Sequence, residues 1–304
     1  MEERKLENWR ITEEAKKNTI LKTGWKALNR VVGGIWLGEI VCFAGRQRSY
    51  KTSILAKIPQ WIVDHNEPPQ VDKGSKPLIL MISFEGDLKY KLFRQMYIHR
   101  HGIAPPKNEP SAGIDELKSY FNDENPYDLV SLDCDPNTMG FDEYVTLVEN
   151  YRNSGYYLAA GIIDYLDMMN PPRNPYSDGN RDETRQELFR KMSDYHKSID
   201  APLFTAHSLN RGAPNATASD NVNPIASFDE YHLSGGSQIA RYFDILVYLH
   251  VERSKTGSRW LAAKYGKVRY RKVEECQQCS IYPLDPEEHL DRQLANLDDY
   301  CENS

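Results

Sequence analysis

Short apolar segments alternate with amphipathic segments along most of the chain. Nearly unbroken apolar runs predict β-strands at residues 40–44, 78–82, 129–132, 158–163, 203–206 and 245–249. Apolar positions at helical spacing predict helices at residues 51–63, 88–98, 141–151 and 184–199. Apolar strands that alternate with helices are typical of a parallel sheet covered on both faces. We therefore predict an α/β fold with a mostly parallel central β-sheet and helices on both faces.

Composition and charge limit the classes of function. The 304 residues are 40% hydrophobic and 27% charged, as in an ordinary globular protein, and their net charge is −6. This charge excludes a protein that coats nucleic acid over its whole surface, but it leaves room for a local basic groove. The sequence has no apolar stretch of membrane-spanning length, begins with charged residues instead of a secretory signal, and has five cysteines, which suit a reducing compartment. We expect a cytoplasmic protein with no membrane partner.

The same patterns divide the chain into a main domain and two flanking segments. Residues 1–20 are rich in charged side chains with a weak apolar stripe, which indicates a solvated linker helix. Residues 21–275 contain all the predicted strands and helices and form the main domain. Residues 276–304 form an acidic tail. Cys276 and Cys279 in this tail make only half of a zinc site, so structural zinc is not favoured.

The strongest candidate for chemistry is the segment that follows the first predicted strand and opens the first predicted helix. A loop in this position directs backbone N–H groups and a helix N-terminus at an anion, as phosphate-binding loops do. Lys51 would then reach the β- and γ-phosphates of ATP, and the Thr52 hydroxyl would bind Mg²⁺. Tyr50 stands where such loops carry glycine, which restricts the backbone and crowds the nucleotide. The alternative is a basic surface turn. The segment consists of Gly45, Arg46, Gln47, Arg48, Ser49, Tyr50, Lys51, Thr52 and Ser53.

Two acidic residues follow predicted strands. Asp164 comes directly after the strand at 158–163, where its carboxylate can hold Mg²⁺ or a water bound to it. Glu85 follows the strand at 78–82 and can act as the general base for an attacking water. The alternatives are a strand that merely ends in Asp, and an acid ahead of a helix, where the macrodipole favours it.

Two later segments add further polar candidates. His207 follows the strand at 203–206 and either senses the γ-phosphate or is a hydrogen-bonded histidine at a strand end. Residues 264–272 hold five basic residues and no acidic ones. This segment could insert a cation into the nucleotide of a neighbouring subunit, contact nucleic-acid phosphates, or form a solvated edge strand.

Taken in order, the motifs resemble a known family. They are Thr-Gly-Trp-Lys-Ala-Leu-Asn at 23–29, Gly-Gly at 33–34, Gly-Glu-Ile at 38–40, the phosphate loop, Ser-Phe-Glu at 83–85, Ile-Ile-Asp-Tyr-Leu at 162–166, His-Ser-Leu-Asn-Arg-Gly at 207–212, and the segment 233–244. Over roughly residues 20–272 this set resembles the ATPase domain of DnaB-type replicative helicases. The resemblance implies a RecA-like P-loop core that binds ATP and Mg²⁺ between the subunits of a ring, usually a hexamer, on single-stranded DNA. Phages often encode compact members, in which case the location would be the host cytoplasm.

The resemblance also implies roles for single residues. Lys51 and Thr52 would bind phosphate and Mg²⁺, Glu85 would activate water, and Asp164 would support the metal. His207 stands where many members have the glutamine that senses the γ-phosphate.

The resemblance extends to residues that act on a neighbouring subunit and on DNA. Lys264 matches the basic residue that acts on the neighbouring subunit. The arginine usually found two positions later falls on Gly266, so Lys267 or Arg269 would substitute for it. The loops after Asp164 and His207 resemble those that face the central channel, which makes three residues candidate DNA contacts, namely Arg173, Arg181 and Arg211.

The leading hypothesis is therefore an ATP-dependent DNA helicase motor that works in DNA replication. Its expected partners are single-stranded DNA, further copies of the chain in a hexameric ring, and a primase or helicase loader. A RecA-like ATPase that serves as a recombination mediator or loader without unwinding is one alternative. A non-catalytic binding module whose phosphate loop has degenerated at Tyr50 is another.

Overall fold

The computed structural model describes most of the main domain. It covers residues 20–68, 74–86, 88–101, 103, 105, 112–171, 181–213, 224–253, 259–269 and 279–284. The predicted linker helix at 1–20 lies outside the described residues except for Ile20, and most of the acidic tail lies outside them as well.

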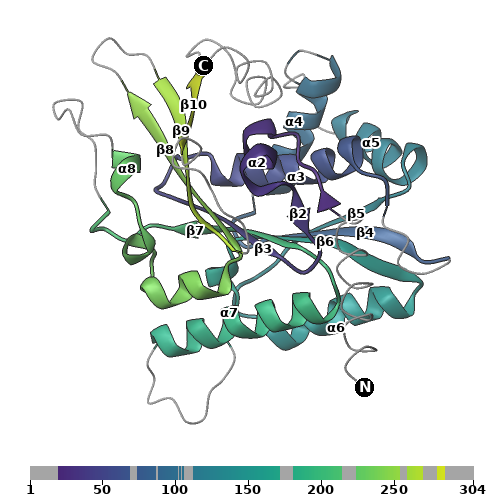
Figure 1. The fold of residues 1–304 in the computed structure, drawn as a ribbon. Helices are drawn as coiled ribbons and strands as arrows, with labels where there is room; N and C mark the ends of the chain where they lie inside the picture. Colours follow the sequence, from purple (N-terminus) through teal and green to yellow (C-terminus); the bar gives the residue numbers. More distant parts are fainter. Residues whose placement is uncertain are drawn as a thin grey trace, which may run out of the picture.

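Within this part of the chain the core is an eight-stranded sheet with the order β10-β9-β8-β3-β7-β6-β4-β5 (Figure 1). The six strands from β5 to β8 in this order are parallel, β9 is antiparallel to β8, and β10 is antiparallel to β9. The predicted mostly parallel sheet is confirmed, and each of its six predicted strands is longer than expected. The strands are β3 (Ile40–Gly45), β4 (Lys76–Ser83), β5 (Asp128–Asp133), β6 (Tyr156–Asp164), β7 (Leu203–Ser208), β8 (Ile245–Arg253), β9 (Arg259–Val268) and β10 (Cys279–Leu284).

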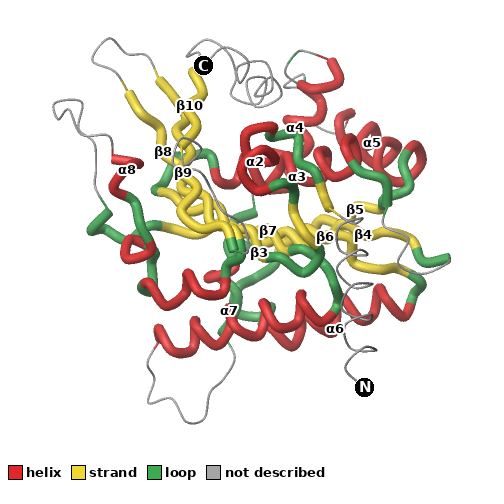
Figure 2. Tube along the Cα trace, in the orientation of Figure 1, coloured by secondary structure: helices red, strands yellow, loops and turns green. Residues whose placement is uncertain are grey.

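Helices cover both faces of the sheet (Figure 2). One face carries α2 (Lys26–Val32), α3 (Lys51–His65), α4 (Leu88–His101) and α5 (Ala112–Lys118). The other face carries α6 (Phe141–Asn153) and α7 (Arg181–Ser198). The four predicted helices are confirmed. The seven-residue helices α2 and α5 were not predicted, because so short a segment shows too little of the helical period.

The remaining elements are short. Strands β1 (Ile20–Leu21) and β2 (Ile35–Trp36) form a separate two-stranded sheet. Single turns occur as a π-helix at Ser119–Glu124, as α8 at Pro224–Ser227, and as 3₁₀-helices at Leu166–Met168, Glu230–His232 and Ser237–Tyr242. None of the helices in the described part of the chain is long and apolar enough to cross a membrane.

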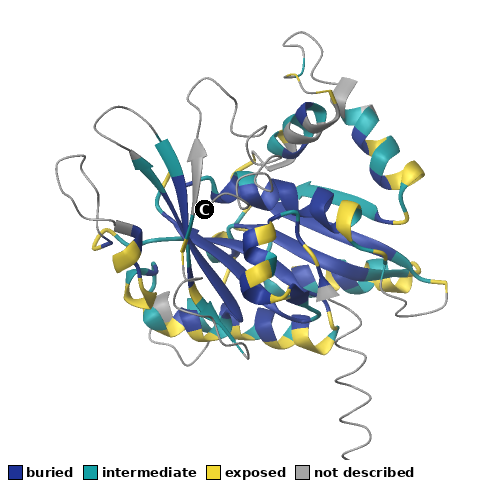
Figure 3. Ribbon diagram, turned by 45° about the horizontal axis from the view of Figure 1, so that its top comes forward, coloured by how far each residue is buried: buried dark blue, intermediate teal, exposed yellow. Residues whose placement is uncertain are grey.

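Strand β3 lies in the middle of the core and is buried on both faces (Figure 3). Val41 and Phe43 belong to the cluster shared with α3, whereas Ile40, Cys42 and Ala44 belong to the cluster shared with α7. This alternation follows from the two-residue period of a strand, and burial on both faces explains why the segment is apolar throughout. The loop after β3 therefore starts from a rigid, fully packed strand.

The ends of the parallel strands bring distant polar residues to one edge of the sheet. Gly45 at the end of β3 pairs with Ser208 on β7, and Ser83 at the end of β4 pairs with Asp164 on β6. Open parallel sheets bind ligands beyond the carboxyl ends of their strands. The predicted phosphate loop and the predicted acidic residues thus meet at the edge where a site is expected.

Candidate nucleotide-binding site

A cleft of about 760 Å³ opens at this edge. Residues 46–53 of the predicted phosphate loop form its floor, and Glu85 and Tyr165 border it beyond β4 and β6. His250 on β8 and Arg259 on β9 border it on the other side. The volume is typical of small-molecule sites, and the walls carry both positive and negative groups.

The phosphate loop is held in an unusual backbone conformation. Gly45 has no room for a side chain, because a Cβ would lie 2.3 Å from Ser49 Oγ and 2.7 Å from the carbonyl oxygen of Leu249. Arg48 and Tyr50 both have a φ of 64°. This left-handed conformation costs a residue with a side chain roughly 1 kcal/mol and costs glycine almost nothing. The Tyr50 ring packs against the core, so the backbone keeps the shape that glycine would allow while the side chain gains contacts.

Lys51 begins helix α3 and points back into the loop. Its ammonium donates to the carbonyl oxygens of Gly45 at 2.8 Å and Arg46 at 2.6 Å, and to Ser49 Oγ at 3.4 Å. Burial lowers the pKa of Lys51 to about 8, although the negative charges of Asp164 and Glu85 act against this shift. The side chain therefore carries its positive charge at neutral pH, in the position that a phosphate would approach.

Asp164 is completely buried at the end of β6. Neither of its carboxylate oxygens has a hydrogen-bond partner among the described residues. Burial raises the pKa of Asp164 to about 6, and the nearby Thr52 hydroxyl is the largest influence in the opposite direction. A buried carboxylate without a partner is costly unless a cation binds it.

This arrangement fits a divalent cation held together with a nucleotide. A carboxylate and a hydroxyl are ligands that Mg²⁺ accepts, and the ion usually takes its remaining ligands from phosphates and water. Consistent with this, no group of three His, Cys, Asp or Glu side chains in the described ranges could hold a metal without such help. Thr52 and Asp164 are the two residues of this chain that would hold the ion.

Glu85 is exposed and borders the same cleft. Its backbone N–H and that of Gly86 donate to Ser83 Oγ at 3.2 and 3.1 Å, which fixes the turn that leaves β4. Helix α4 begins only at Leu88, so Glu85 precedes the helix and its charge faces the site. The negative charge of Glu85 raises the pKa values of both Lys51 and Asp164.

Comparison with known proteins agrees with this geometry. A family model described as divergent DnaB-like ATPase matches residues 6–304. The chain belongs to this family. The resemblance to DnaB-type helicases that the motifs indicated is thereby confirmed.

Individual relatives of this DnaB-like ATPase are distant. The replicative DNA helicase DnaB of Mycoplasma pneumoniae (strain ATCC 29342 / M129) is 24% identical over 236 residues, which are 76% of this chain and 46% of that protein. The chain thus spans about half the length of this curated relative. Among solved structures, an ATPase domain solved on its own matches with a TM-score of 0.63 and 16% identity, covering 92% of this chain and 94% of that one. A DnaB-like replicative helicase, described with its interactions with primase, matches with a TM-score of 0.61 and 15% identity over 88% of this chain and 62% of that one. These structures confirm the RecA-like fold.

In this DnaB-like ATPase, His207 does not border the cleft. Its ring is fully buried and contacts Phe189 and Phe243. The Nε2 atom lies 2.7 Å from the carbonyl oxygen of Ser234, which can only accept a hydrogen bond, so Nε2 carries the proton. These contacts are those of the alternative interpretation, a hydrogen-bonded histidine at a strand end, and the phosphate-sensor role stays a prediction.

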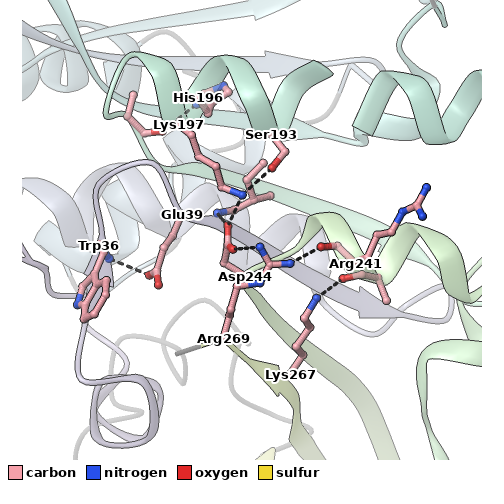
Figure 4. A network of polar contacts seen from close by, with 12 residues as sticks. Trp36, Glu39, Ser193, His196, Lys197, Arg241, Asp244, Lys267 and Arg269 are labelled. Carbon is pink, nitrogen blue, oxygen red and sulfur yellow. Dashed lines mark hydrogen bonds and ion pairs between the residues drawn. The ribbon is translucent and has the colours of Figure 1, made fainter. Parts of the chain in front are cut away.

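The three basic residues predicted to act on a neighbouring subunit are all bonded within their own chain. Lys264 donates to the carbonyl oxygen of Ala226 at 2.8 Å, and Lys267 donates to that of Ala240 at 2.7 Å. Arg269 forms an ion pair with the buried Asp244 at 2.9 Å (Figure 4). Burial lowers the pKa of Lys267 to about 8, and the neighbouring Arg269 adds to this effect.

The positions of these residues follow from the strand register. Lys267 pairs with Leu246 near the start of β8, whereas Gly45 pairs with Leu249 further along it. Lys267 and Arg269 therefore lie toward the edge of the sheet opposite the cleft of their own chain. A role on a neighbouring subunit stays a prediction.

The predicted DNA contacts are only partly described. Arg211 is exposed just after β7, and Arg46 Nη2 donates to the carbonyl oxygens of Arg211 at 3.4 Å and Ala213 at 2.7 Å. Arg46 thus joins the phosphate loop to the segment that carries Arg211. Arg173, the side chain of Arg181, and Cys276 lie outside the described residues, and Cys279 is exposed at the start of β10.

Sequence reasoning missed five residues that border the cleft: Lys91, Tyr165, His250, Val251 and Arg259. Tyr165 follows Asp164 directly, so its position beside the predicted metal ligand was a usable signal. The residues on β8 and β9 carry no motif. They border the cleft because β8 continues to Arg253 and β9 returns antiparallel beside it, which only the fold reveals.

Proposed function

We propose that this DnaB-like ATPase binds ATP with Mg²⁺ and hydrolyses it to move along single-stranded DNA and unwind duplex during replication. The observation that carries the proposal is the meeting of Lys51, Thr52, the unpaired Asp164 and Glu85 at one edge of the sheet. Phosphate-loop ATPases need a cation for the phosphates, two oxygen ligands for the metal, and a group that orients or deprotonates water.

Each group has a chemical task in this proposal. The Lys51 ammonium and the N–H groups at the start of α3 bind the phosphates. Thr52 and Asp164 hold Mg²⁺, which supplies neutralisation of the negative charge that develops during phosphoryl transfer. Glu85 accepts a proton from the attacking water. His207, Lys264, Lys267 and Arg269 keep their predicted roles in sensing and in action on a neighbouring subunit.

Two features support a link between hydrolysis and DNA. Arg46 connects the phosphate loop to the Arg211 segment, so a change in either can reach the other through two hydrogen bonds. A homo-oligomeric ring, most simply a hexamer, would repeat the modest basic patch of Arg173, Arg181 and Arg211 around a channel. Such a local field reconciles DNA binding with a net charge of −6. A primase or a helicase loader is the further partner in this proposal.

The test is ATP hydrolysis by the full chain with and without single-stranded DNA. We expect DNA-stimulated hydrolysis that Lys51→Ala abolishes. Lys76→Ala is the matched control, because Lys76 is a surface lysine at the start of β4, ion-paired with Asp128, at the opposite edge of the sheet. Hydrolysis that is unaffected by Lys51→Ala would contradict the mechanism.

One observation favours a second candidate. Tyr50 and Arg48 in left-handed conformations, with Lys51 bonded to its own loop, also suit a non-catalytic module that has lost nucleotide binding. Calorimetry with an ATP analogue and Mg²⁺ separates the two, because the module would release no binding heat. A strand-displacement assay on forked DNA then distinguishes a helicase from a RecA-like mediator or loader that hydrolyses ATP without unwinding.

A further inference from the structure

Tyr165 lies between the groups of the cleft, and neither the motifs nor the proposed mechanism gives it a role. Its ring borders the cleft and packs on the other side against the hydrophobic core that contains α3. The Lys51 Nζ atom lies 5.5 Å from the centre of this ring. The Thr52 hydroxyl interacts with both Asp164 and Tyr165. The ring is thus fixed from behind and presents its face to the lysine.

The Lys51 ammonium needs a partner that does not compete for its N–H groups. It has three N–H donors, and three acceptors of its own loop receive them. To bind a phosphate it must give up some of these hydrogen bonds. An aromatic face attracts a cation within about 6 Å through its quadrupole and requires no donor. Tyr165 can therefore stabilise the charge both before and after the ammonium turns toward a phosphate.

Resting on the function proposed above, we infer that Tyr165 is a positioning residue that holds the charged Lys51 in the cleft through its aromatic face while the lysine exchanges loop carbonyls for phosphate oxygens. Its action is on Lys51, and no bond to it is made or broken.

The experiment measures the affinity of the full chain for a non-hydrolysable ATP analogue with Mg²⁺, as a function of pH. The variants are Lys51→Ala, Tyr165→Phe, Tyr165→Leu, and fluorinated phenylalanines at position 165, which keep the shape of the ring and weaken its quadrupole step by step. Tyr157→Leu is the control, since Tyr157 is a half-buried tyrosine on the same strand, at its opposite end. Thermal unfolding checks each variant for folding, and Tyr165→Met replaces Tyr165→Leu if the latter does not fold.

The expected results separate electrostatic from structural roles. Tyr165→Phe binds within about twofold of the unmodified chain, whereas Tyr165→Leu binds about tenfold more weakly, as a partly buried cation–π contact predicts. Affinity falls step by step with fluorination. The pH above which binding weakens also moves down by about half a unit in Tyr165→Leu, because the charged lysine has lost a favourable neighbour.

The contrary results are equally distinct. Fluorinated variants that bind as well as Tyr165→Phe, in a chain where Lys51→Ala abolishes binding, would overturn the role of Tyr165 and leave the proposed function intact. An unmodified chain that does not bind the analogue would overturn the proposed function, and this inference with it.

Discussion

Asp164 and Asp244 are both fully buried at ends of parallel strands, yet their surroundings are opposite. Asp244, just before β8, forms ion pairs with Arg269 at 2.9 Å and Lys197 at 3.8 Å, and accepts the Ile40 N–H at 3.1 Å (Figure 4). Asp164, at the end of β6, has no hydrogen-bond partner in the described part of the chain. The same side chain thus has protein partners at one edge of the sheet and none at the other.

The difference shows which edge the fold optimises for stability. Around Asp244 every element that meets there contributes a donor, so the acid joins β3, β8, α7 and the turn after β9. Around Asp164 the protein retains a desolvated carboxylate and, nearby, a tyrosine in a left-handed conformation. Natural proteins keep such unfavourable features mainly where a ligand or a reaction requires them.

The largest expected effect comes from removing the unpaired acid. In Asp164→Asn, Mg²⁺-dependent ATP hydrolysis should fall by about 100-fold or more, because an amide is a poor metal ligand at a site with only one carboxylate. The folded state should become more stable by about 2 kcal/mol at pH 7, because a carboxylate whose pKa is raised to about 6 resists burial in its charged form. Steady-state hydrolysis and thermal unfolding on the same sample check both effects. Loss of stability together with activity would mean that Asp164 is structural.

The next effect is a dependence of stability on acid at the opposite edge. Burial lowers the pKa of His196 to about 4, and its ring is held neutral between the Tyr144 hydroxyl and the Ala201 carbonyl oxygen, both at 2.9 Å. The unfolded chain takes up this proton near pH 6.5, so stability should fall by about 3 kcal/mol as the pH drops from about 6.5 to about 4.

Asp164 acts in the opposite direction over part of this range, because its raised pKa makes the folded chain bind a proton first. Unfolding should therefore be followed in the Asp164→Asn background, where this opposing contribution is absent. The slope should disappear when His196→Gln is added. A slope that survives in the double variant would assign the proton uptake to another group.

The smallest of the three effects concerns the paired acid. Asp244→Asn leaves Arg269 and Lys197 without their shared carboxylate and should lower the free energy of unfolding by about 2 kcal/mol. Both cations are partly exposed, which limits the loss. Urea unfolding measures it. A chain that is as stable as the unmodified protein would show that the two edges do not differ as described.

Local patterns predicted the central layer well. The run from Ile40 to Ala44 is apolar because both faces of β3 are covered, and the following loop and helix are where the motif requires them. Strand ends were less predictable. Ser83, Asp164 and Ser208 are polar, so an apolar pattern stops before them, yet the ladder continues because parallel neighbours bond their backbones.

Contacts between distant segments could not be predicted from patterns. That Arg259 borders the cleft depends on the register of an antiparallel pair, and that Arg269 meets Asp244 depends on four elements that converge. His207 shows a further limit, since the motif gives its place in the order but not the direction of its ring. Nothing in the sequence distinguishes Asp164 from Asp244, because the partners of each come from other strands and helices.

The most direct test of the central claim is a structure of the full chain with a non-hydrolysable ATP analogue and Mg²⁺. The account predicts the β- and γ-phosphates at Lys51 and the start of α3, with the metal between Thr52 and Asp164. A cleft that stays closed to the nucleotide, with the Tyr50 ring across the loop and Lys51 still bonded to Gly45 and Arg46, would contradict it.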